Sequence, residues 1–471
     1  MLSFHDRPVR LCDGLSRREW LRAGGLSVAG LSLPQLWQAR QASAATATAA
    51  NGSTFGRAKH CIVLFMIGGP PQHETWDPKP DAPHEVRGDL KPIASKTSGL
   101  SVGELMPLTA AQTDKIAVLR AMSTGDNAHS SSGYWMLTGR PHSPMNSENA
   151  KVGAPNDAPC LGALVRQLRE NSRVLPSSVV LPDHIWNTGG IPWPGQDGGF
   201  LGKTADPWVM HCDPSAANFD VPGLTLPAEV PPIRFDQRWT LMQQVNRHLE
   251  TIERTSPLPR WGGLNQQAFD LLRSPQARQA FALDQESAAV RDRYGRHRFG
   301  QSVLLARRLI EAGVSLVHVN WPRGKDDKDV NPVWDTHTEN AARLKTALMP
   351  PMDQAYSALL EDLAARGMLD ETLVVWMSEF GRSPKINGAG GRDHWGYVFG
   401  AALAGGGVRG GQVIGASDAL GGHPKEGRHE PQDLTATILH SLGVSPETLI
   451  HDRLGRPLPA STGEVIRGVF G

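Results

Sequence analysis

Apolar runs alternate with amphipathic stretches along most of this chain. Six runs are nearly continuous in apolar residues, which is typical of strands buried on both faces of a sheet. They are Cys61–Ile67, Ile116–Arg120, Ser178–Leu181, Val314–Val319, Thr372–Met377 and Val398–Ala404. The stretches between them carry apolar residues at helical spacing. We expect helices over Leu161–Arg169, Gln237–Ile252, Val303–Ala312, Asp353–Ala365 and Asp433–Leu442.

This alternation predicts an α/β fold, a three-layer α/β/α sandwich with a mostly parallel central sheet. Two regions rich in glycine, Pro182–Pro232 and Gly388–Gly411, are expected to be long excursions over the rim of the sheet. We find no internal repeat. The chain of 471 residues is therefore expected to hold one large domain, although its length would allow two or three.

The amino-terminal segment has the pattern of an export signal. Ser16–Arg22 reads Ser-Arg-Arg-Glu-Trp-Leu-Arg, a Gly/Ala-rich apolar run follows over Ala23–Leu36, and Ala42–Ala44 offers a cleavage site. The paired arginines indicate the twin-arginine route. We expect a signal peptide over residues 1–44, a flexible Ala/Thr-rich linker over 45–58 and the domain over 59–471. An ordinary first helix and an uncleaved anchor are the alternatives.

Export through the Tat translocase would place the protein in the periplasm or outside the cell. The apolar run is shorter than the ~20 residues of a membrane span, so no stable membrane span is expected in the mature form. Removing residues 1–44 takes away six arginines and three acidic residues, which changes the net charge from +1 to −2. Nucleic acid is therefore not an expected partner. Cys160 and Cys212 could pair, but the sequence leaves this open.

The chemistry-bearing residues follow the predicted strands, where open α/β sheets place their ligands. His73 and Asp77 lie on a glycine-rich loop after the first strand. His129 and Ser130 lie in a polar, hydroxyl-rich turn that runs into the start of an apolar helix. The free N–H groups of a helix start favour an anion, and a hydroxyl there could act as a nucleophile. A polar turn in the first case and a serine-rich helix cap in the second are the alternative interpretations.

Two later loops add further donors. Asp335 and His337 follow the strand Val314–Val319 and combine oxygen and nitrogen ligands, a mixture that suits Zn²⁺ or a similar ion. The strand Thr372–Met377 leads into a third group, which the next loop continues; its residues are Glu379, Arg382, Arg392, Asp393 and His394. The carboxylates and imidazoles suit a metal, and the arginines suit phosphate or sulfate oxygens.

These segments resemble the bacterial family called domain of unknown function 1501, which belongs with the alkaline-phosphatase and sulfatase superfamily. The resemblance runs from about His60 to about Ile466. It is carried by Phe65–Pro80, Asn127–Arg140, Pro194–Gln196, Gly199–Gly202, Arg291–Gly295, Trp334–His337, Ser378–Lys385 and Gly391–Trp395. It implies an alkaline-phosphatase-like sandwich, a divalent-metal centre containing Zn, Ca or Mn, and hydrolysis of phosphate or sulfate esters.

The match to that superfamily is partial at the site. Leu137–Gly139 resembles the sulfatase Leu-Thr-Gly, but the position of the nucleophile falls on His129, so formylglycine chemistry is expected to be absent. Asp335 and His337 resemble the Asp…His pair of the phosphoglycerate mutases. Glu379 and Phe380 replace the Asp-His of the usual Ser-Asp-His-Gly, and Asp393 and His394 are expected to restore those donors.

A further departure follows the first strand, where Gly68 replaces the usual metal-binding aspartate and His73 and Asp77 are the local substitutes. The site is thus either a rebuilt metal centre or one that has lost turnover. Two functions follow. The first is an exported metal-dependent hydrolase of phosphate or sulfate esters of small molecules or glycans. In it Ser130 or water attacks, His129 acts as a base or as an unusual nucleophile, and Arg382 and Arg392 clamp the anion. The second is a non-catalytic protein that binds sulfated or phosphorylated glycans or serves in an envelope assembly.

Overall fold

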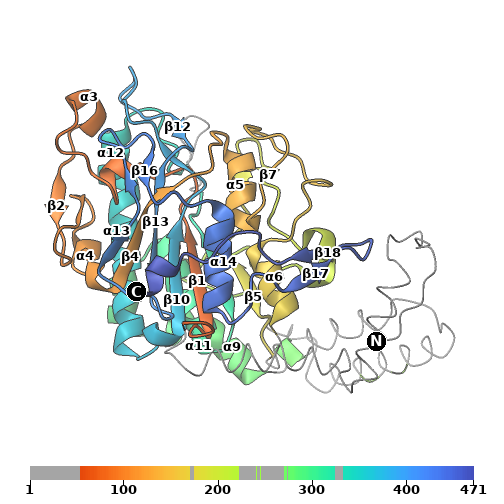
Figure 1. Cartoon of the computed structure of the whole chain (residues 1–471). Helices are drawn as coiled ribbons and strands as arrows, with labels where there is room; N and C mark the ends of the chain where they lie inside the picture. Colours follow the sequence, from red (N-terminus) through yellow and green to blue (C-terminus); the bar gives the residue numbers. More distant parts are fainter. Residues whose placement is uncertain are drawn as a thin grey trace, which may run out of the picture. The chain divides into compact units, whose positions relative to one another are not determined.

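The computed structural model describes residues 54–169, 174–221, 240, 244, 270–272, 274–323 and 333–471 (Figure 1). Residues Gly56–Gly471 form one compact unit, and the architecture below is that of this unit. The predicted signal peptide and most of the predicted linker lie outside the described residues, as does nearly all of the predicted helix Gln237–Ile252.

An eight-stranded sheet forms the centre of this unit. In spatial order its strands are β14 (Gln412–Ile414), β4 (Ile116–Met122), β13 (Phe399–Ala404), β10 (Thr372–Met377), β1 (His60–Phe65), β9 (Leu316–Asn320), β5 (Ser178–Leu181) and β8 (Trp208–Val209). Only β13 among these strands runs antiparallel to its neighbours. The predicted α/β class with a mostly parallel sheet is confirmed, and the six predicted strands match six of these within a few residues.

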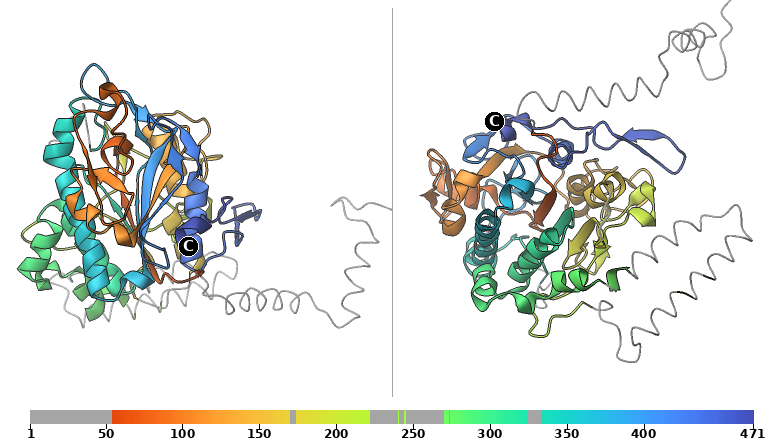
Figure 2. Two further views of the ribbon diagram at one scale, coloured as in Figure 1. Left: turned by 60° about the vertical axis from the view of Figure 1, so that its left-hand side comes forward. Right: turned by 90° about the horizontal axis from the view of Figure 1, so that it is seen from below.

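The sheet is buried because helices cover both faces (Figure 2). One face carries α10 (Ala288–Tyr294), α11 (Arg298–Glu311) and α13 (Met349–Ala365), and the other carries α5 (His129–Thr138), α6 (Leu161–Leu168) and α14 (Pro431–Ser441). From Cys61 to Phe65 every residue of β1 is inaccessible to solvent. The continuous apolar run in the sequence reflects this burial on two sides.

The remaining helices and strands are short. The short helices are α3 (His84–Arg87), α4 (Pro107–Ala110), α9 (Pro275–Phe281) and α12 (Asn340–Arg343). The two-stranded ribbons are β2–β3 (Pro92–Ala94, Ser101–Gly103), β6–β7 (Trp186–Asn187, Ile191–Pro192), β11–β12 (Gly381–Arg382, His394–Trp395), β15–β16 (Ala416–Ser417, Pro424–Glu426) and β17–β18 (Leu449–His451, Pro457–Pro459). The edge strands β8 and β14 and these ribbons were not predicted from the sequence.

Two further observations concern the described residues. Within them, no helix combines the length and the apolar character that crossing a membrane requires. Cys61, Cys160 and Cys212 are free thiols, so Cys160 and Cys212 do not pair. The core is therefore held together by packing rather than by a disulfide.

Candidate metal centre

The candidate site lies at the carboxyl ends of the parallel strands. Asp335 and His337 follow β9, Glu379 follows β10, and His129 is the first residue of α5, which follows β4. His394 lies in the short ribbon strand β12 before β13. Parallel strands end at one edge of the sheet, so these distant segments meet there, as the sequence predicted.

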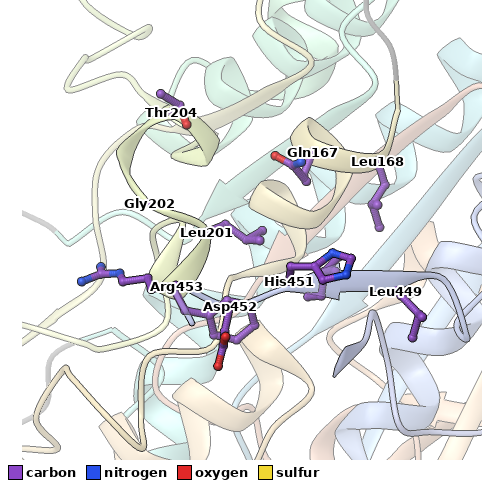
Figure 3. A pocket seen from close by; sticks show the side chains of 11 residues that line it. Gln167, Leu168, Leu201, Gly202, Thr204, Leu449, His451, Asp452 and Arg453 are labelled. Carbon is purple, nitrogen blue, oxygen red and sulfur yellow. The ribbon is translucent and has the colours of Figure 1, made fainter. Parts of the chain in front are cut away.

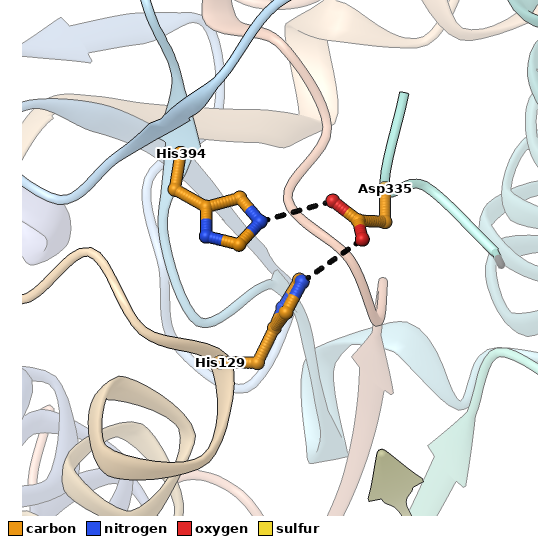
Figure 4. Close-up of side chains that lie close together, drawn as sticks. All are labelled: His129, Asp335 and His394. Atoms are coloured by element: carbon orange, nitrogen blue, oxygen red, sulfur yellow. Dashed lines mark hydrogen bonds and ion pairs between the residues drawn. The ribbon is translucent and has the colours of Figure 1, made fainter. Parts of the chain in front are cut away.

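Three ligand-type atoms converge at this edge. Asp335 Oδ1 lies 3.0 Å from His337 Nε2 and 3.0 Å from His394 Nε2, and the two nitrogens are 2.9 Å apart. His129 Nε2 lies 3.2 Å from the other oxygen, Asp335 Oδ2. The ligand atoms of His129, Asp335 and His394 all lie within 4.8 Å of one another (Figure 4). Such a set of carboxylate and imidazole groups suits Zn²⁺ and similar ions.

A hydrogen bond assigns the tautomer of His394. Its Nδ1 lies 2.7 Å from the carbonyl oxygen of Asn127 and must donate to it, which leaves a lone pair on Nε2. Burial, together with the nearby His129, lowers the pKa of His394 to about 3, so the ring is neutral at neutral pH. The Nε2 lone pair therefore faces a carboxylate oxygen of Asp335. His337 Nε2 lies 2.9 Å from this lone pair and can donate a proton to it, or a cation shared with Asp335 can take the place of that proton, so the residues present fit a divalent metal.

Carboxylates orient the other two imidazoles. His129 Nδ1 lies 2.7 Å from Glu379 Oε1, and His337 Nδ1 lies 2.9 Å from Asp393 Oδ1. Glu379 is fully buried and is held in place by the Gly68 N–H and the Ser378 hydroxyl, each 2.8 Å away. A carboxylate behind a histidine fixes the ring so that the opposite nitrogen can bind a metal. Glu379 and Asp393 therefore have the geometry of orienting groups.

The site is strongly polarised. Burial opposes the charged form of His129, but Asp335 and Glu379 outweigh this effect and raise its pKa to about 10. Burial likewise opposes charge on Asp335, yet Arg382 and His129 hold its pKa well below its usual range. A hydrogen bond to Asp335 also raises the pKa of His337. Asp335 is therefore ionised, and the positive charges of Arg382 and His129 both act on its carboxylate.

Comparison with known proteins assigns the chain to a family. The family described as "Protein of unknown function (DUF1501)" matches residues 58–470. The chain belongs to the DUF1501 family. No curated protein matches this DUF1501 chain, so its own residues must carry the functional inference.

Several solved structures resemble the DUF1501 protein at low identity. The PsFucS1 sulfatase from Pseudoalteromonas sp. has 15% identity over 93% of this chain and 76% of its own, with a TM-score of 0.41. The lipoteichoic acid synthase LtaP from Listeria monocytogenes has 10% identity over 83% and 74%, with a TM-score of 0.39. The phosphonate monoester hydrolase SpPMH from Silicibacter pomeroyi has 11% identity over 88% and 77%, with a TM-score of 0.33.

Gly68 follows β1 and has no room for a side chain. Its φ is +106°, and a Cβ there would lie 2.5 Å from the backbone nitrogen of Asp335. No side chain fits at this position, because the Asp335 loop occupies the space. The backbone N–H of Gly68 contributes instead, by donating to Glu379.

The predicted anion clamp Arg382 is fully buried and has other partners. Its Nη2 lies 2.5 Å from Asp335 Oδ1, and its Nε donates to the Gly69 carbonyl at 3.0 Å. Nη1 donates to the Arg392 carbonyl at 3.1 Å, and Nη2 also contacts the Gly68 carbonyl. Arg382 thus ties the Asp335 loop to the loop after β1 and supplies positive charge from behind the site.

Arg392, the second predicted anion clamp, is also engaged in hydrogen bonds within the protein. Its Nε and Nη2 donate to Glu74 Oε1 at 3.0 and 2.5 Å. Nη2 also donates to the Val86 carbonyl, and Nη1 to the carbonyls of Ser383 and Pro384. All five N–H groups of this fully buried side chain are used. Arg392 therefore has the contacts of a structural brace.

His73 and Asp77 do not join the cluster. Both are buried in the loop after β1, but they face the turn around β15–β16. His73 Nε2 lies 2.8 Å from the carbonyl oxygen of Leu420, while Asp77 accepts from Lys79 and the Ser417 hydroxyl. The first loop thus reaches Glu379 through the backbone N–H of Gly68, and not through His73 or Asp77.

Ser130 points away from the ligand atoms. Its hydroxyl contacts the carbonyl oxygens of Ser147 and Glu148 and accepts the N–H of Ala150 at 2.9 Å. These bonds fasten the 147–150 loop to the start of α5. The Ser130 hydroxyl therefore serves the loop, while the neighbouring His129 faces the ligand cluster.

Two neighbours of His129 were missed from the sequence. Trp193 is buried, and its ring stacks on His129 with centroids 6.0 Å apart. Glu148 Oε2 accepts the backbone N–H of His129 at 2.9 Å. Trp193 lies in the glycine-rich excursion expected over the rim of the sheet, and nothing in the local sequence around Glu148 points to the amino end of α5.

A large cavity lies away from these residues. It measures about 850 Å³ and lies between β17 and the segment Phe200–Thr204 (Figure 3). Its lining includes His451 and Asp452 but none of the residues predicted for the site. Size alone therefore does not identify the functional site of this DUF1501 protein.

Proposed function

We propose that this protein is a metal-dependent hydrolase of phosphate or sulfate esters. The main support is the convergence of Asp335 Oδ1 with the Nε2 atoms of His337 and His394 at 2.9–3.0 Å. Protein metal sites bring such donors together, since metal–ligand bonds of about 2 Å require ligand atoms roughly 3 Å apart. Zn, Mn and Ca remain the candidate ions.

In this proposal the ligands are Asp335, His394 and His129, with His337 completing the set. A divalent ion held there would activate water and stabilise the negative charge that develops on phosphorus or sulfur oxygens. Glu379 and Asp393 orient His129 and His337 through their Nδ1 atoms.

Water is the proposed nucleophile. The Ser130 hydroxyl is committed to the 147–150 loop, and the Nδ1 of His129 is committed to Glu379. The positive charge of Arg382 acts through Asp335, because its side chain has no exposed surface with which to clamp the substrate.

A non-catalytic role is the second candidate. Its support is the Arg382 Nη2–Asp335 Oδ1 contact of 2.5 Å, with which the protein's own cation already neutralises the central carboxylate. A protein of this kind would bind sulfated or phosphorylated glycans, or serve in an envelope assembly, without turnover.

Elemental analysis and turnover together separate these candidates. Purified protein should contain a stoichiometric divalent metal and hydrolyse aryl phosphates or aryl sulfates. The His394→Ala variant should lose both properties, whereas His451→Ala, which changes an exposed histidine of β17 outside the cluster, should keep them. Metal-free wild-type protein, or equal rates in wild type and His394→Ala, would favour the non-catalytic role.

We further propose that the hydrolase acts outside the cytoplasm after export by the Tat pathway. The support is the Arg17-Arg18 pair and the apolar run that follows it. The proposed substrates are phosphate or sulfate esters of small molecules or glycans.

A further inference from the structure

The segment after α5 turns back, so that residues 147–150 lie against the amino end of the same helix. The Ser130 hydroxyl contacts the carbonyl oxygen of Glu148 and accepts the N–H of Ala150 at 2.9 Å. The side-chain amide of Asn187, in β6, donates to the same Glu148 carbonyl oxygen. Glu148 is exposed to solvent, but its backbone is therefore fixed from both α5 and β6.

The carboxylate of Glu148 lies at the amino end of α5. Its Oε2 accepts the backbone N–H of His129, the first residue of the helix, at 2.9 Å. The N-cap residue Ala128 offers no side chain that could accept a hydrogen bond there. The first N–H groups of a helix have no partner within the helix and attract anions. Glu148 thus occupies a donor that an anionic oxygen of a substrate could otherwise use.

The charge of Glu148 also reaches the candidate metal centre. Burial raises the pKa of Glu148, and the neighbouring His129 lowers it. Asp335 and Glu379 raise the same pKa by repulsion between like charges. The Glu148 carboxylate is therefore within electrostatic range of the central carboxylate of the site. Charges interact over several ångströms in a protein, so Glu148 can act on a bound ester without touching it.

The two predicted anion clamps do not offset this negative charge. Arg382 and Arg392 have no exposed surface, and their N–H groups donate to partners within the protein. Attraction of an anionic ester is therefore left to the proposed divalent ion at Asp335. Glu148 opposes that attraction, and its repulsion grows with the charge of the ester.

We propose that Glu148 is a specificity-determining residue whose carboxylate disfavours doubly charged esters. A sulfate monoester or a phosphodiester carries a single negative charge, whereas a phosphate monoester carries about −1.5 to −2 at pH 7. The site should therefore favour the singly charged esters. This inference rests on the proposed function, because it takes the ester to bind at the Asp335 cluster.

The test compares full-length wild-type protein, as purified, with Glu148→Gln. This variant removes the charge but keeps an amide oxygen that can accept the His129 N–H. Glu148→Ala, which removes the charge and the acceptor together, is the second charge-free variant. Glu447→Gln, which neutralises another exposed carboxylate outside the cluster, is the matched control. The loop is exposed at Glu148, so both variants should fold, and thermal melting checks this.

The first measurement is the affinity for inorganic sulfate, a doubly charged anion, by isothermal titration at about pH 8, where carboxylates are ordinarily ionised. The second is the ratio of kcat/KM for 4-nitrophenyl phosphate to that for 4-nitrophenyl sulfate. These two esters share a shape and a leaving group and differ mainly in charge. The ratio therefore isolates the effect of charge from that of reactivity when variant and wild type are compared.

We expect both charge-free variants to bind sulfate about tenfold more tightly than the wild type. The phosphate-to-sulfate ratio should rise about threefold, because the two esters differ by about one charge rather than two. Glu447→Gln should match the wild type in both measurements.

Unchanged or weaker sulfate binding in both charge-free variants would overturn the proposal, whether or not the protein is an enzyme. Sulfate binding by neither the wild type nor the variants would overturn it too, as would an equal gain in Glu447→Gln. Tighter sulfate binding in the charge-free variants without turnover of either ester would support the role of Glu148 and contradict the hydrolase proposal instead.

Discussion

At the scale of single residues, the proposed metal binding depends on how each ligand atom is fixed. Asn127 fixes the tautomer of His394, Glu379 fixes His129, and Asp393 fixes His337. Each of these hydrogen bonds leaves an Nε2 atom facing Asp335. The Nε2 atoms are therefore the proposed metal ligands, and the partners of Nδ1 are the orienting groups.

Replacement of Ser130 tests whether the hydroxyl at the start of α5 attacks the substrate. Ser130→Ala removes hydrogen bonds to the 147–150 loop, so it should cost about 1 kcal/mol of unfolding free energy. Hydrolysis of aryl esters should stay close to the wild-type rate. A loss of activity as deep as that of His394→Ala would make Ser130 the nucleophile and contradict the water mechanism.

The pKa of His129 predicts a pH dependence for the metal-free protein. The pKa rises from the ordinary value of 6.5 to about 10 in the folded protein. Protonated His129 therefore stabilises the fold fully below about pH 6.5, and this contribution is lost as the pH rises through about 10. Urea unfolding of chelated protein should give a free energy that declines between about pH 7 and pH 10. His129→Gln should flatten this decline, and an identical decline in both proteins would refute the assignment.

At the scale of elements, the packing around α5 positions His129. Trp193 from the Gly-rich excursion lies against both His129 and Gly133, so the helix can approach this ring only where it has no side chain. A Cβ on Gly133 would lie 2.3 Å from the ring of Trp193. The excursion that carries Trp193 thus helps to hold His129 in the site.

Gly133→Ala tests this packing. Alanine would gain about 1 kcal/mol in helix propensity, but overpacking against the buried ring should cost more and leave a net destabilisation of about 1–2 kcal/mol. Chemical denaturation should detect it, and metal affinity should fall as His129 shifts. Gly388→Ala, at a glycine with open space around it, is the control and should be neutral. A neutral result for Gly133→Ala would mean that Trp193 does not hold the helix.

The sequence predicted the elements that are buried on both faces better than it predicted the rim. Ser178–Leu181 and Thr372–Met377 were predicted to the residue, because continuous apolar runs follow directly from two-sided burial. The edge strands β8 and β14 are only two and three residues long and lack such runs. Their pairing depends on the neighbouring strand, which local pattern does not reveal.

The site could be predicted only in part, for a similar reason. Residue type and position after predicted strands correctly indicated that Asp335, His337 and His394 lie next to one another. The same rule selected His73 and Arg392, whose side chains turn toward other loops. The direction in which a loop side chain points is set by tertiary contacts, so sequence alone could not separate these cases.

At the scale of the whole molecule, the export proposal is open to a direct test. Replacement of Arg17-Arg18 by a Lys-Lys pair should abolish twin-arginine recognition while leaving the domain unchanged. In a Gram-negative host with a Tat translocase, wild-type protein should fractionate with the periplasm and the variant should remain inside. Equal periplasmic amounts of the two proteins would argue against the Tat route.

The central claim is that distant loops at one edge of the sheet hold a divalent cation on Asp335. Crystals grown with saturating Zn²⁺ or Mn²⁺, measured at the absorption edge of the metal, test it most directly. The account predicts an anomalous peak about 2.0–2.2 Å from an Asp335 carboxylate oxygen and from His394 Nε2. Well-diffracting crystals with no peak there, and with Arg382 still bound to Asp335, would contradict it.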